Sequence, residues 1–235
     1  MPKEEKISYY LKKSKTLENN FEKKIHISIL SSFTLNGIEE IFQVKCNEKN
    51  ISCKTHLGNY NQYNQEILDP NSKLYKSKSD LTFLILDTQS ILEDLWYFPY
   101  SINDKQRESF IESKSNEIKN LIHVFLKNSN SKLILSNFFI PTSSPYGIVE
   151  TKSNFGLQKM IMKLNDSLQK HIQNLDSVYL FDMNGFISKH GENNVFDPKQ
   201  YLFGDLKISL DYMPYFVNNL MGYVIAILGI SKRCI

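Results

Sequence analysis

Residues 23–42 read KKIHISILSSFTLNGIEEIF, and this stretch decides the fold class. Apolar side chains alternate at Ile25, Ile27 and Ile29, which is the two-residue period of a β-strand. A small polar turn follows at residues 31–34, and an apolar helical pattern begins directly behind it. We therefore expect a strand, a turn and a helix, which together form the first unit of an α/β fold with a parallel sheet.

The helix behind this turn is predicted to begin at Asn36. Asn36 and Glu39 have the spacing of a capping box, in which two side chains satisfy free N–H groups of the first turn. The hydroxyl residues of the turn then lie at the carboxyl edge of the sheet. Open α/β proteins bind ligands at this edge, where free amides and a positive helix end favour an anionic or oxyanionic group.

Residues 51–72, ISCKTHLGNYNQYNQEILDPNS, repeat this arrangement with amides in place of hydroxyls. A strand pattern ends near His56, and Asn59, Asn61 and Gln62 follow it. Two polar turns after neighbouring strands can converge on one pocket. The alternative is that both are ordinary solvated turns.

The remaining pattern alternates strands and helices, which predicts a three-layer sandwich with helices on both faces of a five-stranded parallel sheet. Residues 81–86, LTFLIL, are continuously apolar, as expected of a strand buried on both faces. Right-handed crossovers favour the strand order 2-1-3-4-5 of flavodoxin-like folds. The predicted strands are 25–30, 51–56, 81–86, 132–136 and 178–181, and the predicted helices are 4–19, 36–48, 61–68, 88–96, 104–127, 153–174 and 209–229. We expect one α/β domain over residues 23–235, preceded by a helical extension over residues 1–22.

Composition restricts the function classes. A net charge of +3 over 235 residues, with lysines interleaved among acidic residues, argues against a nucleic-acid partner.

The first 20 residues are charged throughout, so no signal peptide is predicted. The most apolar window, residues 212–230, contains Pro214, Asn218 and Asn219, and its helical spacing fits packing on a sheet better than a membrane span. The three cysteines, Cys46, Cys53 and Cys234, have no metal-site spacing and indicate a reducing compartment. We expect a cytoplasmic protein without membrane contact.

Five segments together resemble the N-terminal domain of FkbH-like proteins. They are ILSSFTLNGI at 29–38, NYNQYNQEILDPNSKLY at 59–75, NFFIP at 137–141, FDPKQYLFGDLKISLDYMPYFVNNLM at 196–221 and KRCI at 232–235. The resemblance implies an SGNH-hydrolase-like α/β fold. In that family the segment similar to KRCI continues into the first Asp-rich motif of a HAD-type phosphatase domain, so we expect this chain to end at a domain boundary.

The resemblance also implies partners. The best-known FkbH-like proteins load a glyceryl group from a phosphorylated three-carbon donor onto a carrier-protein thiol, with loss of phosphate. It therefore implies an acyl carrier protein and a phosphorylated three-carbon acyl donor as partners, with a C-terminal HAD domain in the full-length chain. It implies no cofactor in this domain, because the Mg²⁺ of a HAD phosphatase would be held by residues beyond Ile235.

The SGNH motifs carry over unevenly. The first SGNH motif is a Gly-Asp-Ser turn after the first strand, and its Ser is the nucleophile. Ser32 falls at this nucleophile, Ser31 stands at the position of the Asp, and Leu30 stands at the position of the Gly. The oxyanion position of the second motif could be served by Gly58 or the amides around Asn61. Residues 87–90, Asp-Thr-Gln-Ser, stand at the third motif without its Asn, and Asn137 is a possible substitute.

The last motif, Asp and His three residues apart, is matched only by Asp205. Ile208 stands at the His position, and His190 is the nearest other base. The candidate catalytic residues are thus Ser32, Asp205 and His190. The candidate substrate-binding residues are Ser31, Thr34, Gly58, Asn61, Gln62, Asp87, Ser90 and Asn137.

Two main functions remain open at this point, besides a plain interaction module whose pocket is vestigial. The first is a domain that binds the acyl or glyceryl donor, or the carrier-protein thioester, while the HAD domain performs the phosphate chemistry. The second is an active SGNH-type serine esterase or acyltransferase with Ser32 as nucleophile. Because a serine hydroxyl needs a base and oxyanion donors, the missing His predicts weak or no activity of the isolated domain.

Overall fold

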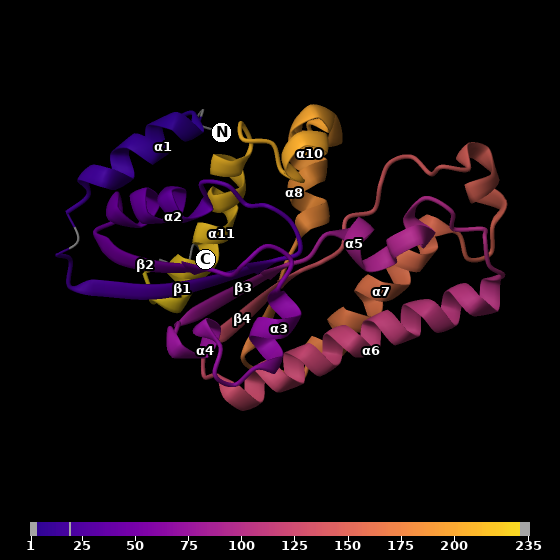
Figure 1. Cartoon of the computed structure of the whole chain (residues 1–235), viewed down its shortest axis with the longest axis horizontal. Helices are drawn as coiled ribbons and strands as arrows, with labels where there is room; N and C mark the ends of the chain where they lie inside the picture. The colour runs from indigo at the N-terminus through magenta and orange to yellow at the C-terminus, as the bar shows by residue number, and fades with distance from the viewer. Residues whose placement is uncertain (1–3, 19, 231–235) are drawn as a thin grey trace, which may run out of the picture.

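The computed structural model describes residues 4–18 and 20–230, which form a parallel sheet between two layers of helices (Figure 1). The strands are β1 (Lys23–Ser31), β2 (Ile51–Leu57), β3 (Leu81–Ile85), β4 (Lys132–Ser136) and β5 (Val178–Phe181). Their order is β2-β1-β3-β4-β5, and every neighbouring pair is parallel. The predicted α/β three-layer sandwich and its strand order are confirmed.

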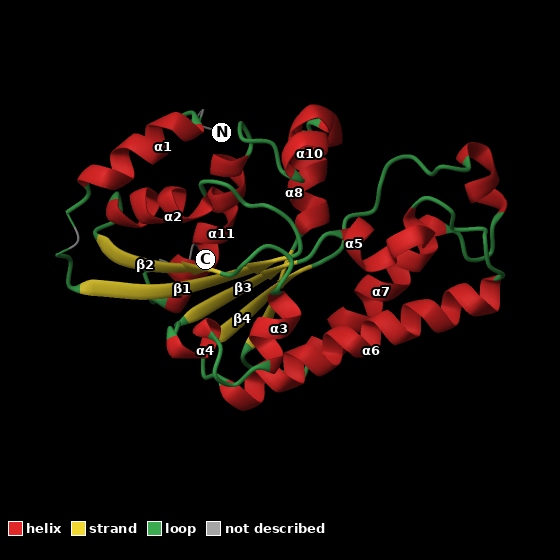
Figure 2. Cartoon of the chain, viewed as in Figure 1, coloured by secondary structure: helices red, strands yellow, loops and turns green. Residues whose placement is uncertain are grey.

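The two helix layers follow from the alternation of side chains along the strands. Ile25, Ile27 and Ile29 of β1 face a core shared with α2 (Ile38–Asn47), α8 (Met183–His190) and α11 (Met213–Ile227). Leu30 of β1 and Leu84 of β3 face the opposite core, which contains α3 (Tyr63–Leu68), α6 (Asp104–Asn128) and α7 (Leu157–Ile172). Figure 2 shows these two sets of helices on opposite sides of the sheet. The remaining elements are α1 (Ile7–Lys13), η1 (Ser14–Thr16), α4 (Lys73–Lys76), α5 (Thr88–Leu92), η2 (Glu93–Trp96), η3 (Gly147–Lys152), α9 (Glu192–Val195) and α10 (Pro198–Gly204).

The start of α2 differs from the prediction. The helix begins at Ile38, and its N-cap is Gly37 with φ of 78° and no side-chain cap. The capping box expected of Asn36 and Glu39 was therefore wrong. A left-handed residue is needed directly before the helix, and glycine adopts it without steric cost. A Cβ atom at Gly37 would also lie 2.7 Å from Cδ1 of Ile7. The structure has a capping box at Asn103, the N-cap of α6.

The apolar window at residues 212–230 forms α11 and packs on the sheet. Phe216, Val217, Leu220 and Val224 are fully buried in the core shared with β1 and β3. Among the residues that the structure describes, no helix is long and apolar enough to cross a bilayer. Cys46 and Cys53 are free thiols buried in the same layer, and Cys234 lies outside the described residues.

The N-terminal extension is attached to α2. The Glu4 carboxylate accepts hydrogen bonds from Nζ of Lys45 at 2.7 Å and from the Tyr10 hydroxyl at 2.8 Å. Tyr10 is buried, and burial raises its pKa, with Glu4 adding to this effect. The side chain of Lys45 is only 7% exposed. Glu4 is thus the anionic partner of an almost buried ammonium group.

We expect Glu4→Ala to lower the free energy of unfolding by about 2 kcal/mol or more, because it leaves the Lys45 ammonium buried without its carboxylate. Urea unfolding followed by circular dichroism measures the change. Glu18→Ala is the matched control, since Glu18 is an exposed glutamate of the same extension; we expect it to alter stability by less than about 0.5 kcal/mol. Equal effects of the two substitutions would show that the extension is not anchored through Glu4.

Candidate functional site

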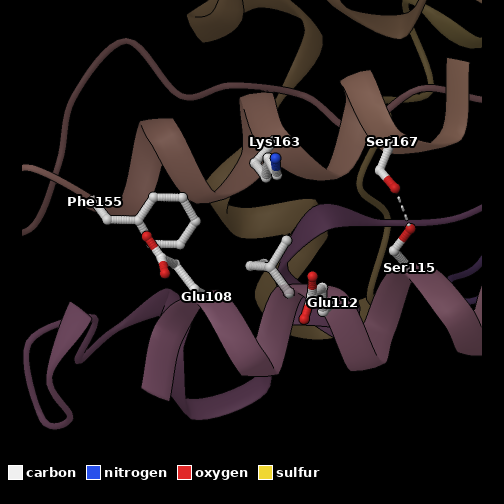
Figure 3. Close-up of a pocket in the computed structure, with 7 residues that line it drawn as sticks. Glu108, Glu112, Ser115, Phe155, Lys163 and Ser167 are labelled. Carbon is white, nitrogen blue, oxygen red and sulfur yellow. Dashed lines mark hydrogen bonds between the residues drawn. The ribbon is translucent and has the colours of Figure 1, made fainter. Parts of the chain in front are cut away.

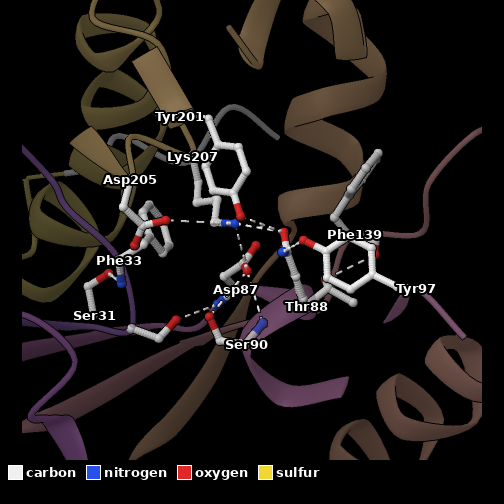
Figure 4. A network of polar contacts seen from close by, with 12 residues as sticks. Ser31, Phe33, Asp87, Thr88, Ser90, Tyr97, Phe139, Tyr201, Asp205 and Lys207 are labelled. Atoms are coloured by element: carbon white, nitrogen blue, oxygen red, sulfur yellow. Dashed lines mark hydrogen bonds and ion pairs between the residues drawn. The ribbon is translucent and has the colours of Figure 1, made fainter. Parts of the chain in front are cut away.

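A buried lysine forms the centre of a polar cluster at the carboxyl edge of the sheet (Figure 4). Lys207 lies in the loop between α10 and α11, and the residue is 9% exposed. Its Nζ donates to Oε1 of Gln89 at 2.8 Å and lies 3.7 Å from the centre of the Tyr201 ring. The same Nζ is 3.4 Å from Oδ2 of Asp87 and 3.8 Å from Oδ1 of Asp205. Two carboxylates, an amide oxygen and an aromatic face therefore surround one ammonium group.

Asp87 is brought to this cluster by β3 and α5. It follows the buried end of β3 and is the N-cap of α5, where its carboxylate accepts hydrogen bonds from the Ser90 N–H at 3.0 Å and the Ser90 hydroxyl at 3.2 Å. Burial raises the pKa of the Asp87 carboxyl, and Lys207 acts in the opposite direction. The candidate residues Asp87 and Ser90 thus form one unit with Lys207.

Asp205 joins the two polar turns that follow β1 and β2. It ends α10 in the left-handed region with φ of 49°. Its backbone carbonyl accepts a hydrogen bond from the Thr34 N–H at 3.2 Å. Its Oδ2 accepts one from the Tyr60 hydroxyl at 2.7 Å, a bond that raises the pKa of Tyr60. The turns therefore meet through Thr34 and Tyr60, whereas Asn61 and Gln62 are exposed.

Ser32, the candidate nucleophile, is enclosed in the turn after β1. The residue is 2% exposed, and its Oγ accepts a hydrogen bond from the Asp87 N–H at 2.8 Å. Its own N–H donates to the Ile85 carbonyl at 3.2 Å. The neighbouring Ser31 Oγ accepts from the Phe33 N–H at 3.1 Å. Both hydroxyls hold the backbone of the site in place.

Two of the candidate oxyanion donors, Gly58 and Asn137, already have acceptors within the domain. The Gly58 N–H donates to the Ile29 carbonyl at 2.8 Å. Nδ2 of Asn137 donates to Oδ1 of Asp182 at 2.8 Å, and Oδ1 of Asn137 accepts from the Met183 N–H at the start of α8. An oxyanion hole needs donors aimed at the position where charge develops. The Gly58 N–H and one side-chain N–H of Asn137 are therefore engaged within the domain.

The structure does not bring a histidine to Ser32. His190 ends α8, where its ring packs against Phe186, Tyr212 and Tyr215. Its Nε2 is buried without a hydrogen-bond partner, and burial lowers the pKa of His190. The structure describes all five histidines of the chain, and no hydrogen bond or ion pair joins any of them to Ser32 or Asp205. Ile208, at the position of the SGNH histidine, is 1% exposed in the core.

A cavity of about 210 Å³ opens beside the Lys207 cluster. The apolar lining residues of the cavity include Trp96, the single tryptophan of the chain. The lining residues are Asp87, Thr88, Gln89, Trp96, Phe139, Glu192, Phe196, Asp197, Pro198, Tyr201 and Lys207. Tyr201 of α10 also borders a second, more open hollow with Tyr60, Leu202 and Phe203. Among the described residues, no group of three or more His, Cys, Asp and Glu side chains could hold a metal ion.

Sequence reasoning missed the residue at the centre of this site. Lys207 stands between the buried residues Leu206 and Ile208, and a lysine between apolar neighbours was the available signal. Its partner Gln89 is 118 residues away in the chain, so spacing alone does not pair them. The short helices α8, α9 and α10 were not predicted either, although Glu192 of α9 and Pro198 and Tyr201 of α10 line the cavity.

Comparisons with known proteins agree with this fold. The N-terminal part of the protein BF1531 from Bacteroides fragilis, described as containing a phosphatase domain complexed with Mg, superposes with a TM-score of 0.79 at 19% identity. The match covers 96% of this chain and 58% of that one, so the chain spans little more than half of that relative.

Two esterase structures match more distantly. The lipase Lip_vut3 from a goat rumen metagenome has a TM-score of 0.51 at 11% identity, over 84% of this chain and 96% of that one. A catalytic mutant of the acetylxylan esterase Axe2 from Geobacillus stearothermophilus has a TM-score of 0.51 at 10% identity, over 89% and 95%. At these identities the likeness shows the fold, which is that of SGNH-like hydrolases.

No curated protein sequence matches the chain. One family model, described as FkbH, N-terminal domain, matches residues 27–225 of the chain. The matched range is most of the chain, and it includes all strands from Ile27 onward, α10 and the Lys207 cluster. The resemblance inferred from the sequence segments is thereby confirmed. This chain belongs to the FkbH N-terminal domain family.

Proposed function

We propose that this domain binds the acyl or glyceryl donor, or the carrier-protein thioester, for transfer onto an acyl carrier protein. Phosphate chemistry would belong to a HAD-type phosphatase domain of the full-length protein. Family membership and the likeness to a BF1531 fragment that contains a phosphatase domain with Mg support this division. The domain itself would need no cofactor, since Mg²⁺ would be held by the phosphatase domain.

The observation that carries the proposal is the cavity beside the Lys207 cluster. Its polar groups are fixed before a ligand arrives, because Asp87 is held by Ser32 and Ser90 while Lys207 is held by Gln89 and Asp87. Its aromatic lining residues can exclude water from a bound acyl group. Prearranged polar groups with an apolar wall are typical of a binding site.

The second candidate function is a serine esterase or acyltransferase, as the lipase and acetylxylan esterase folds suggest. Ser32 would be the nucleophile, with Asp205 or His190 in support. The geometry favours it less. Ser32 is enclosed, the Asp205 carboxylate is bonded to Tyr60, and the His190 ring is packed among aromatic residues.

Fluorescence of Trp96 tests the proposal at the site itself, because no other tryptophan contributes. We expect the domain to show a saturable fluorescence change with glyceryl-S-pantetheine, 3-phosphoglycerate or both. Phe139→Ala removes an aromatic lining residue of the cavity and is expected to weaken binding about fivefold or more, since burying an aromatic ring contributes on the order of 1–2 kcal/mol.

The matched control lies in a separate groove of about 310 Å³ between α6 and α7, where Glu108, Glu112, Lys163 and Ser167 face one another (Figure 3). Lys163→Ala in this groove is expected to leave the titration unchanged. A flat titration with both compounds would contradict the proposed function. So would an equal loss of affinity in Phe139→Ala and Lys163→Ala.

A further inference from the structure

We infer that the cavity beside Lys207 takes the uncharged pantetheine arm of a thioester and excludes the phosphorylated donor. This inference rests on the proposed function and narrows it to one of the two ligand classes. It follows from the charges that line the cavity and from the hydrogen bonds that those charges already make.

The lining is acidic. Among the described residues that line the cavity, Asp87, Glu192 and Asp197 are carboxylates and Lys207 is the single cation. The Lys207 ammonium is already bonded to Gln89 and placed against Asp87 and Asp205. A phosphate would compete with these partners for the ammonium group, and drawing Lys207 away would leave Asp87 without its counter-charge inside the protein.

The other two carboxylates are fixed by hydrogen bonds. Oε2 of Glu192 accepts from the Thr142 hydroxyl at 2.6 Å and from the Thr142 N–H at 3.2 Å. Oδ1 of Asp197 caps α10 by accepting from the Lys199 and Gln200 N–H groups at 2.8 and 3.3 Å. Bonds from the Gln200 and Lys199 N–H groups lower the pKa of Asp197, so this carboxyl stays ionised at neutral pH. An incoming phosphate would therefore meet like charge.

The same surface is complementary to an amide arm. A phosphate at neutral pH offers mainly acceptor oxygens, whereas pantetheine offers two amide N–H groups and hydroxyls as donors. Carboxylate oxygens at the cavity wall can accept from such donors. Trp96, Phe139 and Phe196 supply apolar surface for the methyl and methylene groups of the arm.

Titrations followed by Trp96 fluorescence separate the two ligand classes. We expect pantetheine to bind at least tenfold more tightly than 3-phosphoglycerate at equal ionic strength. Glu192→Gln removes one negative charge but keeps an acceptor for Thr142. It is expected to strengthen 3-phosphoglycerate binding severalfold, so that the preference for pantetheine over 3-phosphoglycerate narrows. Asp197→Asn is the second variant should Glu192→Gln not fold, and Glu112→Gln, in the groove between α6 and α7, is the control with no expected effect.

Each outcome decides the inference. A wild-type preference for pantetheine over 3-phosphoglycerate that becomes smaller in Glu192→Gln supports the inference. Preference for 3-phosphoglycerate overturns it and leaves the proposed function intact, because a donor would then occupy the site. A preference that is the same in wild type, Glu192→Gln and Asp197→Asn also overturns it, since charge would not be the cause. Binding of neither compound contradicts both the inference and the proposed function.

Discussion

Lys207→Met is expected to lower the free energy of unfolding by about 3 kcal/mol at pH 8. The substitution preserves much of the volume of the side chain but removes the only ammonium group that lies against Asp87 among the described residues. The side chains of Lys207 and Asp87 are 11% and 15% exposed, so water compensates little for the lost partner. Removing one member of a buried ion pair typically costs on the order of 3–5 kcal/mol. Urea unfolding measures the loss.

The destabilisation by Lys207→Met should depend on pH, and the raised pKa of Asp87 determines the direction of this dependence. Burial raises the pKa of this carboxyl in the folded state, so the folded protein binds more protons than the unfolded chain over the intervening pH range. Stability therefore falls as pH rises from the ordinary carboxyl pKa of about 4 to the raised value. Without Lys207, which opposes the rise, this range extends to higher pH. The destabilisation by Lys207→Met should be smaller at pH 5 than at pH 8.

The double variant Asp87→Asn with Lys207→Met isolates the cause. It has no carboxyl at position 87, so its stability should exceed that of Lys207→Met at pH 8 and lose the added pH dependence. If Lys207→Met were equally destabilising at pH 5 and pH 8, with no recovery in the double variant, the loss would come from packing. The ion pair between Lys207 and Asp87 would then not stabilise the fold as proposed here.

The second large effect concerns catalysis. We expect the isolated domain to hydrolyse simple esters and S-acyl pantetheine at rates close to the uncatalysed background. Lack of a general base typically removes about two to four powers of ten in rate, and lack of one oxyanion donor another two to three. No imidazole is bonded to Ser32, and the Gly58 and Asn137 donors are engaged elsewhere.

Ser32→Ala provides the control for this expectation. It should leave the background rate unchanged while lowering stability by about 1 kcal/mol, because the Asp87 N–H loses its acceptor. Turnover that disappears in Ser32→Ala would favour the esterase. Turnover that survives the substitution would indicate a different nucleophile.

The strands and the long helices could be predicted because their signals are local. The alternating run at Ile25–Ile29 and the continuous run at residues 81–86 reflect burial on one or both faces of a sheet, and the structure places β1 and β3 there. The start of α2 could not be predicted correctly, since both a capping Asn36 and a left-handed Gly37 fit the sequence. In the structure Gly37 lies close to Ile7 of the N-terminal extension, which is distant in the chain, so the sequence around the helix does not reveal this contact.

The candidate site was predicted only in outline for a similar reason. Asp87 and Ser90 follow β3 and Thr34 follows β1 at a short distance in the chain, so the topology brings them to the same edge. The roles that the SGNH resemblance gave to Ser32, Asp205 and His190 depend on long-range contacts between side chains. Those contacts attach Ser32 to the Asp87 backbone and Asp205 to Tyr60, and they place His190 among aromatic residues. The role of Lys207 could not be predicted, because this residue meets Asp87 and Gln89 only in the folded chain.

Mass spectrometry after exposure to a fluorophosphonate probe tests most directly whether this hydrolase-like fold serves binding without serine catalysis. The probe forms a covalent adduct only with a serine that is accessible and activated by a base. We expect the intact mass of the domain to stay unchanged under conditions that fully label an active serine esterase. A stoichiometric adduct that maps to Ser32 and is absent from Ser32→Ala would contradict it.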